Sequence, residues 1–251
     1  MGEVVIMIKK VTGIIVSGVD YKESSKIINI LTDEGEIIGV LAKGCKGIKS
    51  KIRIGTDLLT LGDFYLRQYG TGMPLLTEVD IIDFFKNTRL DLLKQSYALL
   101  LLELSSQIVR HEKNKEVYSL LVLGLKKIDE GYDAEVISDI LELKFLSELG
   151  IKPELDCCVS CGRVDNIITV SSYKGGYLCG DCAKGEVIYS LKTVRLIRML
   201  YLVDLSKISR ISLSEEVKRE ISSFIDDYYD RYSGIYLKSR EFLKKFSCLN
   251  N

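Results

Sequence analysis

The chain has 251 residues, 47% of them hydrophobic, and its 35 lysines and arginines equal its 35 aspartates and glutamates in number. This composition indicates a folded protein rather than a disordered one, and no apolar run approaches the ~20 residues that a membrane-spanning helix needs. His111 is the single histidine, so a catalytic triad or a multi-histidine metal centre is hard to build. The opening residues MGEVVIMIKK lack the features of an export signal, and we therefore expect a cytoplasmic protein.

The first 80 residues alternate short apolar runs with turn residues, which is typical of β-strands. The expected strands cover residues 13–21, 26–32, 36–44, 57–70 and 73–80. Asp33-Glu34-Gly35 is a hairpin-turn signal between the second strand and the third. Five short strands are too few for a large sandwich, so we expect a small closed barrel such as an OB-fold over residues 1–80.

A cluster of basic residues, which we call the basic loop, follows the third expected strand and contains no acidic residue. Its basic members are Lys43, Lys46, Lys49, Lys51 and Arg53. Their spacing suits successive phosphates, and the glycines at 44 and 47 let a nucleic-acid backbone approach closely. We therefore expect the loop to hold single-stranded DNA; the alternative is a solvated hairpin without a ligand. Arg67, with Tyr65 and Tyr69 on the same face of the next strand, is a weaker candidate for this surface.

After Asp80 the apolar residues recur at steps of three and four, which predicts helices. The expected helices cover residues 87–109, 117–128, 134–149, 191–203, 214–232 and 237–246. We expect Asp133 to cap the third of them and Gly150 to end it. The predicted fold class is therefore α+β and multidomain, with a five-stranded barrel followed by a helical domain over residues 81–251.

Five of the seven cysteines lie between residues 157 and 182. Cys158-Val-Ser-Cys161 and Cys179-Gly-Asp-Cys182 form two Cys-x-x-Cys pairs, and their separation suits a zinc site. Four thiolates would complete a tetrahedron and leave no open position for water or substrate, so we expect one structural Zn²⁺. This zinc module would be inserted into the helical domain at about residues 151–189, with a hairpin turn at Gly175-Gly176.

Two alternatives stay open for the module. Cys157 could replace Cys158 as a ligand, since it forms a Cys-x3-Cys pair with Cys161. The cysteines could also be a redox-active or incidental group of thiols. We expect Cys45 and Cys248 to have no part in the site.

The order of these parts resembles that of the RecO family of bacterial recombination mediators over essentially the whole chain. The resemblance rests on the stretch GIIVSGVDYKESSKIINILTDEGEIIGVLAKGCKGIKSK, on the segment DCCVSCG…GGYLCGDC, and on the C-terminal YLKSREFL. The basic loop departs from the family at Cys45, Gly47 and Ile48, and it lacks the paired arginines often found there. The fold that the resemblance implies is an OB domain followed by a helical domain in its zinc-binding form.

The resemblance implies a protein of DNA repair and recombination that is not an enzyme. Such a protein binds single- and double-stranded DNA, anneals complementary strands and, with RecR, helps to load RecA onto strands coated by single-stranded-DNA-binding protein. Whether RecF takes part stays open. The resemblance also implies a cytoplasmic, nucleoid-associated protein. No GxxxxGK[ST] phosphate loop occurs, so we expect no nucleotide to bind.

Positive charge also gathers on the last expected helix, where Lys238 and Arg240 are the main candidates. They would form a second DNA contact or a dock for the acidic tail of single-stranded-DNA-binding protein; the alternative is a solvated face. Two other functions compete with DNA mediation. One is a zinc-ribbon adaptor or transcription accessory protein with little DNA affinity, and the other is a nuclease that uses carboxylates and a separate divalent ion.

Overall fold

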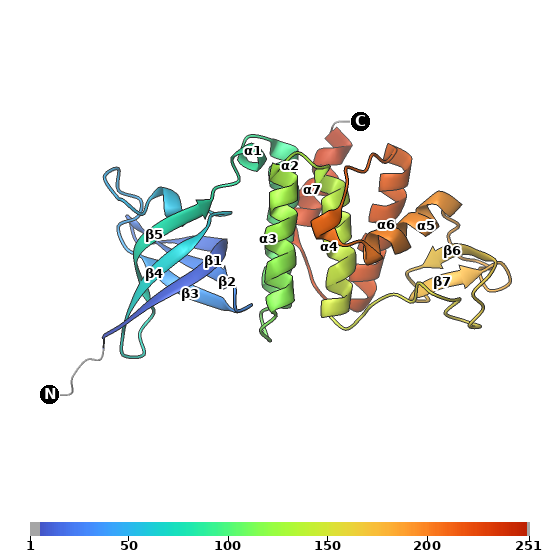
Figure 1. Ribbon diagram of the computed structural model, residues 1–251, viewed down its shortest axis with the longest axis horizontal. Coiled ribbons are helices and arrows are strands. Elements are labelled where there is room, and N and C mark those ends of the chain that lie inside the picture. Colours follow the sequence, from blue (N-terminus) through green and yellow to red (C-terminus); the bar gives the residue numbers. More distant parts are fainter. Residues whose placement is uncertain (1–5, 250–251) are drawn as a thin grey trace. The chain divides into compact units, whose positions relative to one another are not determined.

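The structure, a computed structural model, describes residues 6–249, with side chains from residue 7 to residue 245 (Figure 1). It confirms the α+β class, with five strands first and helices after them. Two compact units divide the chain: Met1–Asp129 with Ser239–Asn251 form the first, and Glu130–Lys238 form the second. The first unit therefore contains helices as well as the barrel. The division expected from the sequence, with a barrel domain over residues 1–80 and a helical domain after it, stays a prediction.

The N-terminal strands form a closed barrel in the order β1-β2-β3-β5-β4. The strands are β1 (Ile6–Tyr21), β2 (Ser25–Thr32), β3 (Ile37–Ala42), β4 (Leu61–Tyr69) and β5 (Leu75–Asp83). Neighbouring strands are antiparallel except β3 and β5, which run parallel and pair at Leu41 and Leu75. A five-stranded barrel of this kind is what the short apolar runs predicted.

β1 starts at Ile6 rather than at residue 13, because its first half has a partner of its own. Residues 6–14 pair with β4, and residues 13–21 pair with β2. The register shifts between Ile15 and Ser17, and such a bulge lets one strand bend from one neighbour toward the other. At the crossing lies Gly13, where a Cβ would stand 2.6 Å from the carbonyl oxygen of Leu31. Only a residue without a side chain fits there.

Side chains from every strand fill the barrel. Buried members from the five strands in turn are Ile15, Ile28, Val40, Phe64 and Leu76. Cys45 belongs to the same core although it lies outside the strands, and the half-buried Ile52 packs against that core. These two side chains therefore anchor the segment between β3 and β4 to the barrel.

The helices of the first unit begin directly after β5. They are α1 (Lys86–Arg89), α2 (Leu92–Ile108) and α3 (Lys115–Asp129), joined by most of α7 (Lys238–Leu249). The single helix expected over residues 87–109 is broken at Leu90. Asp91 then caps α2, since its carboxylate accepts hydrogen bonds from the amides of Leu93 and Lys94 at 3.0 Å each. The apolar steps continue across the break, so the periodicity did not reveal it.

The second unit follows the predicted order closely. It contains α4 (Ala134–Glu148), the hairpin of β6 (Ile167–Ser171) and β7 (Gly176–Cys179), α5 (Leu191–Leu202) and α6 (Glu215–Tyr232). Asp133 caps α4 as expected, accepting from the amide of Glu135 at 3.1 Å. Two short 3-10 turns, η1 (Ile54–Thr56) and η2 (Leu205–Lys207), complete the described elements of the chain. Among these described helices, none combines the length and the apolar character needed to span a bilayer.

Candidate metal centre and nucleic-acid interface

Two tight backbone turns carry the cysteine pairs. In the first turn, the amide of Gly162 donates to the carbonyl of Cys158 at 2.8 Å, and the amide of Cys158 donates to the carbonyl of Arg163 at 2.7 Å. In the second, the amide of Cys182 donates to the carbonyl of Cys179 at 3.0 Å. Gly162 has a φ of 75°, in the left-handed region that glycine adopts at little cost. The sequence therefore folds locally so that both sulfurs of a pair can face one point.

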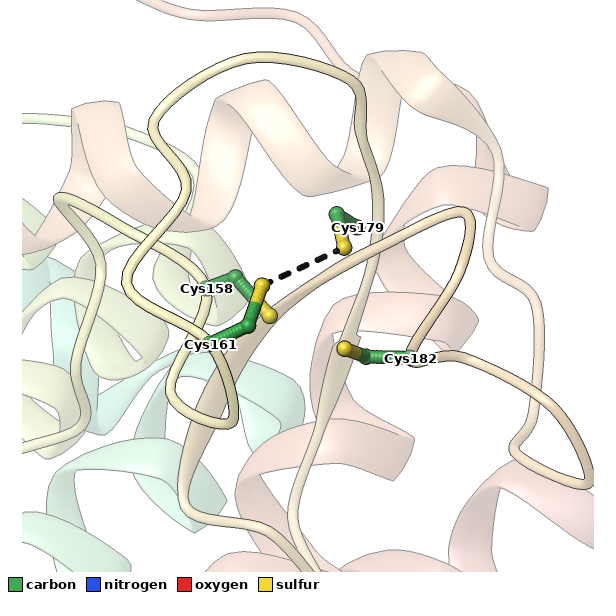
Figure 2. A group of neighbouring side chains, drawn as sticks. All are labelled: Cys158, Cys161, Cys179 and Cys182. Carbon is green, nitrogen blue, oxygen red and sulfur yellow. Dashed lines mark hydrogen bonds between the residues drawn. The ribbon is translucent and has the colours of Figure 1, made fainter.

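The four sulfurs do converge (Figure 2). The Sγ atoms of Cys158, Cys161, Cys179 and Cys182 all lie within 4.8 Å of one another. Those of Cys161 and Cys179 are 3.7 Å apart, far beyond the ~2.05 Å of a disulfide. A zinc ion with four Zn–S bonds of about 2.3 Å would place its sulfurs about 3.8 Å apart. The donor set and its size therefore fit a tetrahedral zinc site, and these four residues could hold the ion.

The protein environment favours one thiolate in this cluster before any metal arrives. Burial acts to raise the pKa of Cys158, but hydrogen bonds from the backbone of Cys179, Cys161 and Ser160 outweigh it and lower that pKa to about 6. Hydrogen bonds with Cys161 and Cys179 and burial raise the pKa of Cys182 to about 12. One sulfur is therefore ready to act as a ligand, whereas a metal that binds the cluster must displace the proton of the Cys182 thiol.

The other cysteines lie apart from the cluster. Cys157 is half-buried, and its pKa is raised by burial and by the carboxylate of Glu154, which favours the neutral thiol. Of the two neighbours that the sequence left open, the structure thus brings Cys158 to the other sulfurs. Cys45 is buried in the barrel core, and the side chain of Cys248 lies outside the described residues.

The apolar core around the cluster is small. Besides the cysteines themselves it contains the buried Leu178 and Ala183, with Ile167 and Ile168 packed against them. So few apolar side chains bury little surface, and domains of this kind depend on metals or other cross-links for stability. A bound metal would therefore supply a large part of the module's stability.

Ion pairs that the sequence analysis missed also support the module. The guanidinium of Arg163, just after the first cysteine pair, donates to the carboxylate of Asp181, inside the second pair, at 2.7 Å. Arg198 on α5 donates to the carbonyl of Leu155 at 3.0 Å and to the carboxylate of Asp156 at 2.8 Å. Partners this far apart in sequence leave no local signal, although an arginine just after one cysteine pair and an aspartate inside the other could have suggested the first contact.

The basic loop is held in place by the barrel. The amide of Gly44 donates to the hydroxyl of Ser25 at 3.1 Å, and the amide of Lys46 donates to the carbonyl of Ser24 at 3.0 Å. Cys45 and Ile52 provide the apolar anchors described above. The side chains of Lys43, Lys49, Lys51 and Arg53 are exposed. Within the described part of the chain, none of these four forms an ion pair with an acidic side chain.

The remaining predicted DNA contacts differ in how accessible they are. Lys46 is partly neutralised, because its Nζ lies 2.5 Å from the carboxylate of Asp20. Arg67 is exposed on β4, and Lys238 is exposed at the start of α7. Arg240 is only 9% exposed, which argues against a contact between its guanidinium and a phosphate, and the expectation that it binds DNA stays a prediction.

The two tyrosines beside Arg67 have different surroundings. The Tyr65 hydroxyl donates to the carboxylate of Asp80 at 3.0 Å. Tyr69, at the end of β4, is exposed. Of this pair, Tyr69 is therefore the one whose ring is accessible to a base.

Comparison with known proteins separates the barrel from the helical part of the chain, which is a different division from that into two compact units. Residues 7–85 match the family described as "Recombination protein O N terminal", and residues 89–241 match "Recombination protein O C terminal". DNA repair protein RecO of Halalkalibacterium halodurans is 36% identical over 247 residues, covering 97% of both chains. DNA repair protein RecO of Bacillus subtilis is 34% identical over 249 residues, covering 98% of this chain and 97% of its own. Matches of this length and identity establish that the chain belongs to the RecO family of DNA repair proteins.

Proposed function

We propose that this chain acts in DNA repair and recombination by binding single- and double-stranded DNA and annealing complementary strands. The observation that carries the proposal is the basic loop, where Lys43, Lys49, Lys51 and Arg53 are exposed on a segment anchored to a barrel. Cations that contact phosphates bind DNA without reading its sequence. Annealing needs this property, because it must act on strands of any sequence. Arg67, Lys46 and Lys238 are the secondary contacts in this proposal.

Zinc has a structural role in the proposal. Cys158, Cys161, Cys179 and Cys182 would bind one Zn²⁺ and hold the two cysteine turns together. A site with four sulfur ligands has no open position, so the ion would take no part in a chemical step. The basic loop lies in the first unit, whereas the cysteines lie in the second.

Membership of the RecO family supports a set of partners. We propose that the chain works with RecR and single-stranded-DNA-binding protein to load RecA, and that RecF is a candidate further partner. Binding and annealing break no covalent bond, so we propose a mediator rather than an enzyme, acting in the cytoplasm at the nucleoid. The sequence contains no phosphate loop of the GxxxxGK[ST] form, in keeping with a mediator that does not hydrolyse ATP.

The salt dependence of DNA binding tests the basic loop. We expect the variant Lys43→Ala/Lys49→Ala/Lys51→Ala to bind single-stranded DNA with a slope of log K against log salt that is less negative by about 2, since each phosphate contact contributes about 0.7. A matched control is Lys126→Ala/Lys152→Ala/Lys192→Ala, which removes the same charge from exposed lysines elsewhere. Fluorescence anisotropy between 50 and 300 mM salt, roughly the range in which such slopes are resolved, measures both.

Two results would count against the proposal. If the basic-loop variant kept the slope of log K against log salt of the unaltered protein, as the control variant should, the basic loop would not be the DNA contact. If the unaltered protein, carrying its zinc, neither bound nor annealed labelled oligonucleotides at low salt, the mediator function would fail. That second result would favour an adaptor protein with little DNA affinity.

A further inference from the structure

One large apolar side chain stands among the cations of the basic loop. Ile48 is 90% exposed, more than any other large hydrophobic side chain in the described part of the chain. Single exposed apolar residues are common on protein surfaces and do not by themselves indicate a function. The way the loop is built around Ile48 is therefore what matters.

Three consecutive turns that share their corner residues build the loop. Amide-to-carbonyl hydrogen bonds close them from Gly47 to Gly44 at 3.2 Å, from Ser50 to Gly47 at 3.0 Å, and from Arg53 to Ser50 at 3.3 Å. A turn closed in this way has two central residues. The central residues are therefore 45 and 46 in the first turn, 48 and 49 in the second, and 51 and 52 in the third.

The middle turn differs from the other two. In the first and third turns, one central residue is held against the barrel core, namely Cys45 and Ile52, and the other is a lysine. In the middle turn both central residues, Ile48 and Lys49, are exposed. The flanking turns therefore fix the loop to the barrel, while the middle turn presents an apolar side chain next to a cation.

We propose that Ile48 contacts the bases of a single DNA strand whose phosphates are held by Lys49 and its neighbours. This inference rests on the proposed function and adds to it a contact that does not depend on charge. The bases of a single strand can splay apart once the backbone is held, and isoleucine is among the apolar residues that proteins insert between base steps.

This contact has a direct consequence for annealing. An aliphatic side chain against the face of a base makes no hydrogen bond with its Watson–Crick edge. The strand would therefore be kept unstacked while its pairing edges stay available to a complementary strand. The cations around Ile48 favour a nucleic acid over an apolar protein surface as its partner, because burying them against such a surface without anionic partners is costly.

Three single variants of the full-length, zinc-loaded protein separate this contact from the electrostatic one. Ile48→Ala should weaken binding to single-stranded DNA about fivefold to tenfold and leave the salt slope unchanged, because it removes apolar contact and no charge. Lys49→Ala, one residue away in the same turn, should make the slope less negative by about 0.7. Leu90→Ala, which removes a side chain that is 78% exposed on the first unit, should change neither quantity.

A base analogue reports the contact itself. The fluorescence of 2-aminopurine in a single strand rises when the base leaves its stack, so the unaltered protein should raise it at saturation and Ile48→Ala should not. If Ile48→Ala matched the unaltered protein in both affinity and fluorescence, the inference would be overturned while the basic-loop function stood. If the unaltered protein bound no single strand, the proposed function itself would fail. The two failures are thereby distinguishable.

Discussion

At the scale of single residues, the buried carboxyl of Asp139 on α4 is a source of instability. It is 3% exposed, and its Oδ2 has no hydrogen-bond partner among the described residues. Burial raises the pKa of this carboxyl well above its usual value, and the charges of Glu142 and Glu135 on α4 and of Asp226 on α6 add to the effect. The native state therefore holds the Asp139 proton more tightly than the unfolded state does, and stability falls as pH rises above about 4 toward the native pKa.

We expect Asp139→Asn to stabilise the protein at neutral pH. The amide has nearly the same shape but cannot ionise, so the free energy of unfolding at pH 7.5 should rise. The gain should shrink as the pH falls toward 4, because the unfolded-state carboxyl then becomes increasingly protonated, as the native one already is. Chemical denaturation at several pH values measures it, with Asp230→Asn on the exposed face of α6 as the control. A gain of equal size at pH 4 and pH 7.5 would contradict this account.

Residue-level roles were also where sequence reasoning was least complete. The spacing of the cysteines identified the cluster, but the choice between Cys157 and Cys158 depended on backbone hydrogen bonds that only the folded turn provides. Charge density identified the basic loop, yet it could not show that Lys46 pairs with Asp20, or that Arg240 is buried. In the sequence, Ile48 stood out only as an apolar residue among the lysines of the basic loop. Its exposure in the folded loop is what suggests a contact with DNA bases.

At the scale of elements, the zinc module is the part whose stability depends most on a bound ion. We expect Cys161→Ser/Cys182→Ser, which removes one sulfur from each pair, to purify with close to no zinc, and the unaltered protein to carry one ion per chain. Structural zinc contributes an apparent ~10–16 kcal/mol in small zinc-finger peptides, so its loss should unfold the module first. Metal analysis and hydrogen exchange at the β6–β7 hairpin measure the two effects. Cys157→Ser is the matched control, and loss of zinc from that variant would contradict the ligand set.

Element boundaries show what sequence periodicity can and cannot predict. α4 and α6 were expected within one or two residues of their observed ends, because Asp133 caps α4 and an apolar stripe marks α6. β1 was expected too short, since residues 6–12 do not alternate cleanly and are strand only because β4 pairs with them. The break before α2 was missed because Asp91 caps a helix whose apolar pattern runs through the break. Strand pairing therefore fixed the start of β1, and a capping side chain fixed the start of α2, where the pattern of apolar residues predicted neither.

At the scale of the whole molecule, the proposed DNA-binding loop and the proposed zinc site lie in different units. The basic loop belongs to the first unit and is anchored in the barrel core, whereas the cysteine cluster belongs to the second and has a small core of its own. Removing zinc with a chelator should therefore lower the thermal stability of the second unit, yet leave the salt slope of single-strand binding unchanged to within about 0.5, less than the contribution of one phosphate contact.

Circular dichroism during heating measures the first effect, and anisotropy titrations at several salt concentrations measure the second. Zinc added back after the chelator should restore the thermal transition, which controls for irreversible damage. A slope that becomes less negative by 1 or more after zinc removal, about the contribution of one or two phosphates, would show that cations held by the module also contact DNA. Arg163 and Lys184, beside the two cysteine turns, would then be the residues to change next, because both are exposed and basic.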